Sequence, residues 1–432
     1  MQLTIPAALQ YAAREFGDAE ALAEPGGPRL SYRELAGQTA VVARALIAEG
    51  VRTGDRVAIW SPNTYHWVLG ALGTLTAGAV LVPVSTRFTG PEALDVISRA
   101  QARALLVAGP FLGTDRLAAL RAAAAGKDLD PDRAGSPQCG LTSLSTVVRI
   151  PVEAGTGPAE GTLSWDEFLA RATAVPARAG TKRAGAIRPD HVSDILFTSG
   201  TTGRSKGAMS AHRQAMAVAR AWAECGRLSP GDRYLVVNPF FHSFGYKAGI
   251  LACLASGAAL VPQLVYDAEQ AMDLVEAERI TVFPGPPTIY QTILDHPGRA
   301  ARDLSSLRLA VTGAATVPVA LVERMRAELS FETVLTAYGL TEAVVATMCR
   351  PGDDPKLVAG TSGRATADFE IRIAGPDGQD GRDGQPGEIL LRGPNVMLGY
   401  AGDRAATAAA IDPDGWLHTG DIGRLDPGGN LV

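Results

Sequence analysis

The order of apolar and polar residues in the first third of the chain switches between helical and strand spacing. Residues 32–49 and 67–76 repeat apolar side chains at the spacing of a buried helix face, and the first fifteen residues predict a further amphipathic helix. Residues 56–60 and 80–84 are instead short, unbroken apolar runs, which are typical of strands buried on both faces. This alternation predicts βαβ units, with helices on both faces of a parallel sheet.

Two later segments interrupt the alternation. Residues 113–162 are rich in Ala, Gly, Asp, Pro and Ser, and they predict a surface excursion that contains a helix at 115–125 and a strand-like run at 146–151. Residues 176–190 are rich in Ala, Arg and Gly and lack clear periodicity. We therefore expect a linker between subdomains at 176–190.

Strands and helices alternate again after this linker, and the texture changes once more after residue 350 to short β runs separated by Gly, Pro and Asp. The pattern predicts an α/β fold with two doubly wound βα subdomains, 1–186 and 187–350, and a small β-barrel at 351–432. The expected strands are 195–198, 234–237, 259–262, 280–283, 309–312, 333–337, 369–373, 388–392 and 416–425. One helix is expected directly after His212, and further helices are expected at 248–254, 268–278 and 319–329.

Composition narrows the class of protein. With 46% apolar residues, 20% charged residues and a net charge of −5, the chain is typical of soluble globular proteins and lacks the basic excess of a nucleic-acid binder. No apolar run reaches the ~18 residues of a membrane-spanning helix. The cysteines, Cys139, Cys225, Cys253 and Cys349, lie far apart without CxxC spacing, which favours reduced thiols in a cytoplasmic protein. A homodimer is left open.

The most informative segment is residues 194–207, where an apolar strand runs into a loop of small residues that ends in a lysine. Glycines let backbone N–H groups close around a phosphate, hydroxyls add donors, and the lysine adds a positive charge. The spacing does not fit a Walker loop, because no glycine directly precedes the lysine and no hydroxyl follows it. A flexible polar linker is the alternative reading. The residues expected to hold phosphate are Thr198, Ser199, Gly200, Thr201, Thr202, Gly203 and Lys206.

Three further segments lie at predicted strand ends or turns. His242 lies between a strand and a helix, at the strand end where ligands gather in parallel sheets, although a lone histidine is more often packed or solvated. Gly313, Ala314 and Ala315 would let a flat ring lie against the backbone, or would serve tight strand–helix packing. Asp421 follows a glycine at a turn, and its carboxylate could accept hydrogen bonds from both hydroxyls of a ribose.

The segment from Tyr338 to Glu342 combines groups that suit a nucleotide. Tyr338 offers an aromatic face for a purine, and Gly339 permits close approach of the backbone. Thr341 supplies a hydroxyl for a phosphate, and Glu342 supplies the hard oxygen ligand that Mg²⁺ prefers. Thr341 and Glu342 could instead cap the N-terminus of a helix.

In this combination and order, the segments resemble the AMP-forming adenylate ligases (the ANL superfamily of acyl-CoA synthetases, adenylation domains and luciferases) over nearly the whole chain. The resemblance implies that residues 198–206 hold the β- and γ-phosphates of ATP, that Thr341 contacts the α-phosphate and that Glu342 binds magnesium. Lys206, His242, Thr341 and Glu342 would be the catalytic residues. The nucleoside would be held by Gly313, Ala314, Ala315, Tyr338, Gly339 and Asp421, and the acyl pocket would be lined by Phe240, His242, Phe244, Tyr246, Gly285, Ala337, Gly339 and Val344.

Four strings, residues 61–67, 241–252, 283–291 and 311–318, resemble an actinobacterial branch of this superfamily. Its members include ligases for propanoate side chains on fused rings from steroid breakdown, and ligases of terpenoid antibiotic pathways. The resemblance implies an acyl-CoA ligase that activates a bulky apolar carboxylic acid with ATP and Mg²⁺ through an acyl-adenylate and transfers it to CoA. An acyl carrier protein is the alternative acceptor.

Two departures from the pattern leave alternatives open. Relatives continue into a C-terminal lid domain that carries the adenylation lysine and much of the CoA surface, whereas this sequence stops at Val432, so we expect a truncated ligase. Where relatives have glycine or small polar residues, residues 343–346 read Ala-Val-Val-Ala, which is expected to narrow or shift the acyl pocket. A single-step enzyme, limited to adenylation or to thioester formation from a supplied acyl-adenylate, and a non-catalytic acyl-AMP-binding module are the alternatives.

Overall fold

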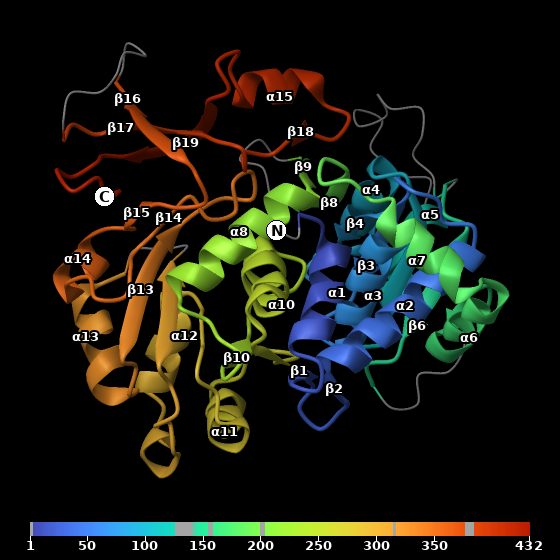
Figure 1. Cartoon of the computed structure of the whole chain (residues 1–432), viewed down its shortest axis with the longest axis horizontal. Coiled ribbons are helices and arrows are strands. Elements are labelled where there is room, and N and C mark those ends of the chain that lie inside the picture. Colours follow the sequence, from blue (N-terminus) through green and yellow to red (C-terminus); the bar gives the residue numbers. More distant parts are fainter. Residues whose placement is uncertain are drawn as a thin grey trace.

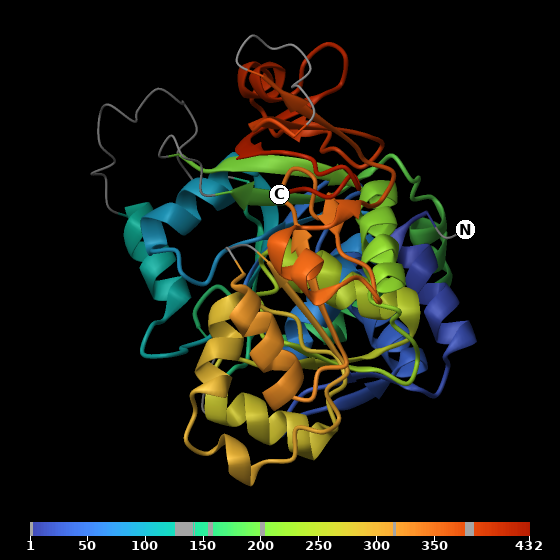
Figure 2. The same ribbon diagram turned by 90° about the vertical axis from the view of Figure 1, so that its left-hand side faces the viewer.

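Two large sheets and a smaller third sheet organise the chain, and the small sheet lies above one end of the large ones (Figures 1 and 2). The computed structural model describes residues 3–125, 141, 143–153, 159–198, 204–313, 317–375 and 384–432. Each large sheet combines strands that are far apart in the sequence, and these strands meet beneath the small sheet.

The first large sheet has eight strands in the order β18-β9-β8-β4-β3-β5-β6-β7. Its central strands pair in parallel, with Arg56 of β3 beside Val80 of β4, as the alternating pattern predicts. At one edge β9 and β18 pair antiparallel. The bounds are β3 Arg56–Trp60, β4 Val80–Pro83, β5 Ala102–Ala108, β6 Thr146–Ile150, β7 Leu163–Ser164, β8 Val192–Thr198, β9 Lys206–Ala211 and β18 Gly399–Tyr400.

Helices cover both faces of this sheet, which confirms the predicted βαβ arrangement. Val57 and Ile59 share a core cluster with α2 and α3. Ala58 and Trp60 point to the opposite face, because side chains alternate along a strand, and they cluster with α4 and α5. The bounds are α1 Ile5–Glu15, α2 Tyr32–Ala48, α3 Tyr65–Thr76, α4 Gly90–Arg99, α5 Arg116–Ala125 and α6 Trp165–Ala170.

The second large sheet consists of two halves that are joined at one residue. Four strands in the order β10-β11-β1-β2 form one half, and β12-β13-β14-β15 form the other. Val282 makes parallel bridges to Tyr234 and to Leu309, so the predicted strand 280–283 is an extended segment with a single ladder position. The bounds are β1 Glu20–Ala23, β2 Arg29–Ser31, β10 Arg233–Val236, β11 Ala259–Pro262, β12 Leu309–Gly313, β13 Thr333–Tyr338, β14 Thr347–Met348 and β15 Arg364–Ala365.

Helix α8 lies between the two large sheets (Figure 1). It packs against a π-helix, Tyr246–Leu251, and against α10, so the predicted helix 248–254 is divided between these two elements. π-helices are rare and are frequent at functional sites. The remaining bounds are α8 His212–Cys225, α9 Ser243–Gly245, α10 Ala252–Ser256, α11 Ala268–Glu278, α12 Pro287–Leu294, α13 Val319–Glu328 and α14 Pro355–Gly360.

The predicted linker at 176–190 contains helix α7, Ala177–Gly185, after a 3₁₀-helix at Arg171–Ala174, although the sequence showed no clear periodicity there. α7 packs on α2 so closely that an added Cβ at Gly180 would lie 3.1 Å from the side chain of Arg44. Alanine and arginine are strong helix formers, and this preference outweighs the weak periodicity of the segment. The predicted excursion at 113–162 also contributes to the core, because its strand β6 extends the first large sheet and buries Val148 and Ile150.

The sheets cross the predicted boundary at residue 186. Strands β8 and β9 follow that residue and join the first large sheet, whereas β1 and β2 precede it and join the second. The division into 1–186, 187–350 and 351–432 therefore stays a prediction about chain organisation and does not describe how the sheets are built.

The third sheet has three antiparallel strands in the order β16-β17-β19. The described residues after 350 do not close into the predicted barrel, because β15 pairs with β14 and β18 pairs with β9. Short runs broken by Gly and Pro indicate strands but do not reveal their partners. The bounds are β16 Glu370–Ala374, β17 Gly387–Arg392, α15 Arg404–Ala410 and β19 Leu417–Gly423.

Two further findings concern the described residues as a whole. None of their helices is both long and apolar enough to cross a bilayer. Cys225, Cys253 and Cys349 are buried free thiols, and Cys139 lies outside the described residues.

Candidate active site

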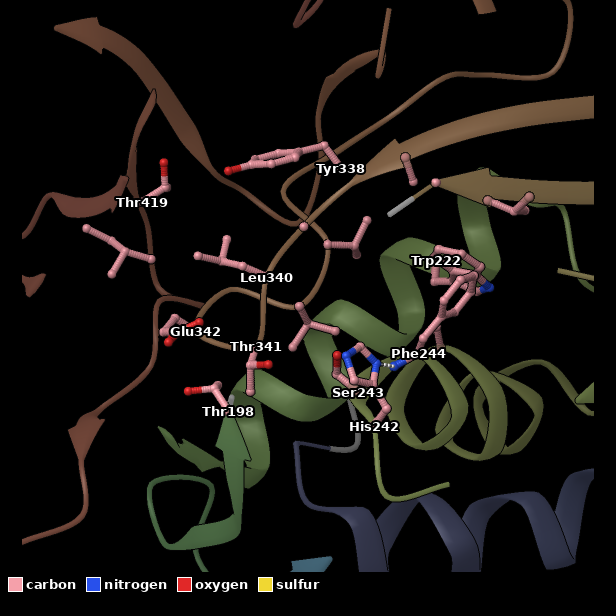
Figure 3. A pocket seen from close by; sticks show the side chains of 18 of the residues that line it. Thr198, Trp222, His242, Ser243, Phe244, Tyr338, Leu340, Thr341, Glu342 and Thr419 are labelled. Atoms are coloured by element: carbon pink, nitrogen blue, oxygen red, sulfur yellow. Dashed lines mark hydrogen bonds between the residues drawn. The ribbon is translucent and has the colours of Figure 1, made fainter. Parts of the chain in front are cut away.

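A cavity of about 500 Å³ lies where the ends of β8, β12 and β13 face the small sheet. Its walls also include residues of α8, of the loop before the π-helix, and of β18 and β19. Figure 3 shows that Thr198, Thr341 and Glu342 gather on one side of the cavity, whereas Trp222 and Phe244 lie on the other. The cavity therefore has a polar side and an aromatic side.

Most of the predicted site residues that the structure describes line this one cavity. They are Thr198, Lys206, His242, Phe244, Gly313, Ala337, Tyr338, Gly339, Thr341, Glu342 and Val344. The predicted residues Ser199, Gly200, Thr201, Thr202, Gly203, Ala314 and Ala315 lie outside the described residues. The ends of β8, β12 and β13 and the residues that follow them, spread over more than a hundred residues, are thus brought to one place, and the individual roles stay predictions.

Three predicted acyl-pocket residues are not on the wall. Phe240 and Tyr246 are fully buried and pack against Trp67 in the core, with ring centroids 5.2 and 6.1 Å from it. Gly285 faces the side chain of Ile289, which lies 2.9 Å from the position of an added Cβ. These residues belong to the packing behind the cavity rather than to its surface.

The hairpin of β8 and β9 positions the predicted phosphate lysine. Thr198, the last residue of β8, is paired with Lys206, the first residue of β9. The segment before the lysine is tied to α4, because Arg99 donates to the carbonyl of Ser205 at 2.7 Å and Arg204 forms an ion pair with Asp95 at 2.9 Å. Lys206 therefore enters the cavity from a backbone that is fixed on both sides.

The turn from Gly339 to Val344 forms part of the cavity wall. An added Cβ at Gly339 would lie 1.9 Å from the carbonyl oxygen of Val344, so only glycine fits there. Val344 itself has φ of 66°, which is strained for a β-branched residue. No helix starts in this described segment, so Thr341 and Glu342 are not helix caps and instead face the cavity. Val344 was expected to narrow or shift the acyl pocket, and its side chain is placed to do so because the residue lines the cavity wall.

His242 caps the short helix α9 and lies between the polar and aromatic sides (Figure 3). Its Nδ1 accepts a hydrogen bond from the N–H of Phe244 at 3.2 Å, which leaves the proton of a neutral imidazole on Nε2. His242 is an exposed residue on the cavity wall, and neighbouring protein removes part of the water around its ring. This partial desolvation, together with the positive charge of Arg87, lowers the pKa of His242 and favours the neutral ring.

Tyr338 and Asp421 connect the large sheet to the small one. The Tyr338 hydroxyl donates to Oδ2 of Asp421 at 2.6 Å. Burial, and then this hydrogen bond, raises the pKa of Tyr338, so the phenol stays protonated. Tyr338 lines the cavity and Asp421 is an exposed residue of β19 beside it, which places both near one edge of the site.

The aromatic side contains residues that the sequence did not single out. Trp222 of α8 packs edge-on against Phe244 at 5.4 Å, and its Nε1 donates to the hydroxyl of Tyr234 at 3.1 Å. Helical periodicity could place Trp222 on a buried face but could not show that this face meets a cavity. The other unpredicted wall residues are Ser243, Ala248, Val311, Thr312, Leu340, Tyr400, Leu417, His418 and Thr419, whereas Val345 belongs to the segment 343–346 that was expected to narrow the pocket.

Glu342 is the carboxylate of the polar side. Within the described ranges there is no cluster of three or more His, Cys, Asp or Glu that could hold a metal ion by itself. Oε1 of Glu342 accepts from the hydroxyl of Tyr400 at 2.8 Å, and no described residue donates to Oε2. One open carboxylate oxygen fits a magnesium ion that takes its other ligands from phosphates and water.

The chain belongs to the AMP-binding enzyme family, whose pattern it matches over residues 9–401. Its relatives include CoA ligases. The chain is 54% identical over 426 residues to the 3-(7a-methyl-1,5-dioxo-octahydro-1H-inden-4-yl)propanoyl:CoA ligase of Rhodococcus jostii. This match covers 99% of this chain and 78% of the relative. The enzyme of the same name from Mycobacterium tuberculosis is 55% identical over 430 residues, with the same coverage.

A solved structure gives the same fold. The anthranilate CoA ligase AuaEII in complex with anthranoyl-AMP is similar to this chain with a TM-score of 0.85 at 25% identity. The similarity covers 99% of this chain and 77% of that one. The α/β fold and the membership in the AMP-forming ligases that the sequence predicted are thereby confirmed.

Proposed function

We propose that this chain is the nucleotide- and acid-binding part of an AMP-forming CoA ligase for a bulky, apolar, fused-ring carboxylic acid. The observation that carries the proposal is a single cavity with two unlike sides. Thr198 and Glu342 offer a hydroxyl and a carboxylate on one side, and Trp222 and Phe244 offer aromatic surface on the other (Figure 3). Lys206 adds a cation to the polar side, because it lies over the ring of Tyr400, whose hydroxyl donates to Glu342. A carboxylic acid whose ring system occupies the aromatic side has its carboxylate beside the phosphates.

The relatives support this substrate class. Two CoA ligases that are more than half identical to this chain are named for a propanoate on a fused bicyclic ring. The cavity has a volume of about 500 Å³, so a nucleotide and an acid of that kind would together fill it and extend partly beyond it. Val344 and Val345 on its wall favour an apolar ring over a polar chain.

The proposed reaction needs no nucleophile from the protein. The acid's carboxylate attacks the α-phosphorus of ATP, pyrophosphate leaves and an acyl-adenylate forms, after which the thiol of CoA displaces AMP. Lys206 would neutralise the departing pyrophosphate, Thr341 would donate to the α-phosphate, and neutral His242 would donate from Nε2 to an oxygen of the reacting groups. Glu342 would hold a magnesium ion, which supplies charge neutralisation for the phosphates when it is bound.

The experiment that tests this function has two readouts. The full-length enzyme should release pyrophosphate when it is given a fused-ring acid with ATP and Mg²⁺, and a non-hydrolysable acyl-AMP analogue of the same acid should bind more tightly than ATP. Lys206→Ala should lower kcat/KM for ATP roughly 100-fold, as the loss of a group that stabilises transition-state charge does. Lys356→Ala is the matched control, because Lys356 is an exposed lysine of α14. Neither turnover nor analogue binding with any polycyclic acid would refute the proposal.

Two alternatives within the family give different results. A single-step enzyme would form a thioester from a supplied acyl-adenylate and CoA without consuming ATP, or would stop at the adenylate. A non-catalytic module would bind the analogue without any turnover. The thiol acceptor is separated by offering CoA and a phosphopantetheine-loaded carrier protein in parallel. A cytoplasmic location agrees with the buried free thiols of Cys225, Cys253 and Cys349. Analytical ultracentrifugation would test whether the protein forms a homodimer.

A further inference from the structure

Tyr400, which no sequence motif singled out, lies between the two charged residues of the polar side. Its hydroxyl donates to Oε1 of Glu342 at 2.8 Å. The Nζ atom of Lys206 lies over its ring, 5.2 Å from the ring centroid. The ring also forms part of the cavity wall. One side chain therefore touches both the lysine proposed for the triphosphate and the carboxylate proposed for magnesium.

The backbone around Tyr400 is anchored to the elements that carry both partners. Tyr400 of β18 pairs with Ala208 of β9, the strand that begins at Lys206. Three residues earlier, the N–H of Met397 donates to the carbonyl of Glu342 at 2.8 Å. The short segment 397–400 thus connects the backbone of Glu342 to the strand that begins at Lys206.

The arrangement keeps opposite charges apart. Lys206 and Glu342 are both described residues, and they form no ion pair with each other. An aromatic face attracts a cation without neutralising it, and a phenol satisfies one carboxylate oxygen while leaving the other open. If the ring were absent, the flexible lysine could reach the carboxylate, and each charge would then satisfy the other instead of a ligand.

We propose that Tyr400 is a positioning residue that separates Lys206 from Glu342 and aims both at the cavity, so that phosphate oxygens and not the two side chains neutralise their charges. This inference rests on the proposed function of the polar side. It predicts two separable contributions. The ring acts as a spacer, and the hydroxyl orients the carboxylate.

Two variants separate these contributions. Tyr400→Phe keeps the ring and loses the hydrogen bond to a charged group, and it should raise the Mg²⁺ concentration that half-saturates the reaction roughly tenfold while leaving the KM for the acid unchanged. Tyr400→Leu removes the spacer as well, and it should also weaken ATP binding without Mg²⁺, measured by calorimetry, by roughly tenfold or more. Tyr11→Leu, on the exposed face of α1, is the control for replacing a tyrosine.

A double variant decides whether the spacer role is real. In a Glu342→Gln background there is no carboxylate to capture Lys206, so Tyr400→Leu should have little further effect on Mg²⁺-free ATP binding. A merely structural role of the ring would give the same loss in both backgrounds and would overturn the inference, as would unchanged ATP binding in Tyr400→Leu itself. ATP binding does not depend on the acid, so an enzyme that binds ATP normally but activates no polycyclic acid would refute the proposed function and not this inference.

Discussion

Breaking the buried ion pair of Lys247 and Asp194 should be one of the most destabilising single changes in this chain. Lys247 of the π-helix lies 2.9 Å from Oδ1 of Asp194 of β8, and both side chains are 0% exposed. Lys247 also donates to Ser210 at 2.8 Å, and Ser193 donates to Oδ2 of Asp194 at 2.6 Å. Both charges are therefore fully removed from water and are paired with each other.

The magnitude follows from this geometry. Two unit charges 2.9 Å apart attract by about 6 kcal/mol at an effective dielectric constant of about 20. That attraction offsets the desolvation of both ions, so the intact pair adds little net stability, whereas removing one partner leaves the other charge buried and alone. Lys247→Met should accordingly lower the free energy of unfolding by about 3–5 kcal/mol.

The assay is a double-mutant cycle in urea. Lys247→Met and Asp194→Asn are each measured by far-UV circular dichroism and tryptophan fluorescence, and the double variant is measured beside them. The double variant should recover most of the loss, with a coupling energy of about 3 kcal/mol, because no isolated charge remains. A loss below about 1 kcal/mol in Lys247→Met, or strictly additive effects, would refute the reasoning. Since β8 ends at Thr198 and the π-helix follows His242, the single variants should also raise the KM for ATP.

Three further predictions concern pH, pocket size and strand contact. Burial lowers the pKa of His66 and of His212 to about 4, below the ordinary 6.5, so the unfolded chain binds protons that the folded chain does not. The free energy of unfolding should therefore fall as pH decreases from about 6.5 to about 4, by roughly 3 kcal/mol for each histidine, and the variant His66→Phe with His212→Asn should flatten this slope in urea titrations at several pH values. Trp222→Phe should enlarge the aromatic side and shift the ratio of kcat/KM values toward the larger of two competing acids, with the KM for ATP unchanged; an unaltered ratio would remove Trp222 from the acid site. Gly313→Ala would place a Cβ 2.4 Å from a carbonyl oxygen of β13 and should destabilise the chain by about 1–3 kcal/mol, whereas Gly37→Ala, with open space around it, should be neutral or slightly stabilising.

Local sequence signals predicted the elements well where one physical cause dominates. The buried runs at 56–60 and 80–84 became β3 and β4 because an uninterrupted apolar strand can only lie in the middle of a sheet. The helix within 176–190 could not be read from periodicity, because it forms through the helix propensity of alanine and arginine, which is a weak signal over nine residues. The expected barrel did not form, because β15 and β18 pair with strands of the large sheets. Such long-range pairing is not contained in local sequence patterns.

The candidate site divides in the same way. Motifs with unusual residue types, such as Lys206 after a glycine-rich loop or Glu342 after Tyr338 and Gly339, pointed to residues that line one cavity. Phe240 and Tyr246 could not be told from wall residues, because an aromatic residue beside a motif is equally suited to the core. Tyr400 gave no signal at all, since its place between Lys206 and Glu342 arises from the pairing of β18 with β9 across nearly two hundred residues.

The cavity wall draws on segments from Thr198 to Thr419, so it exists only while the small sheet stays docked on the large ones. A ligand in the cavity thus binds the docked state alone and, at a hundredfold excess over its Kd, favours that state by about 2.7 kcal/mol. Amide hydrogen exchange across residues 384–432 should slow on nucleotide addition, including at amides that the nucleotide does not touch. Nucleotide supply would then govern how long the newly made chain resists proteolysis, which couples its lifetime to the energy state of its surroundings.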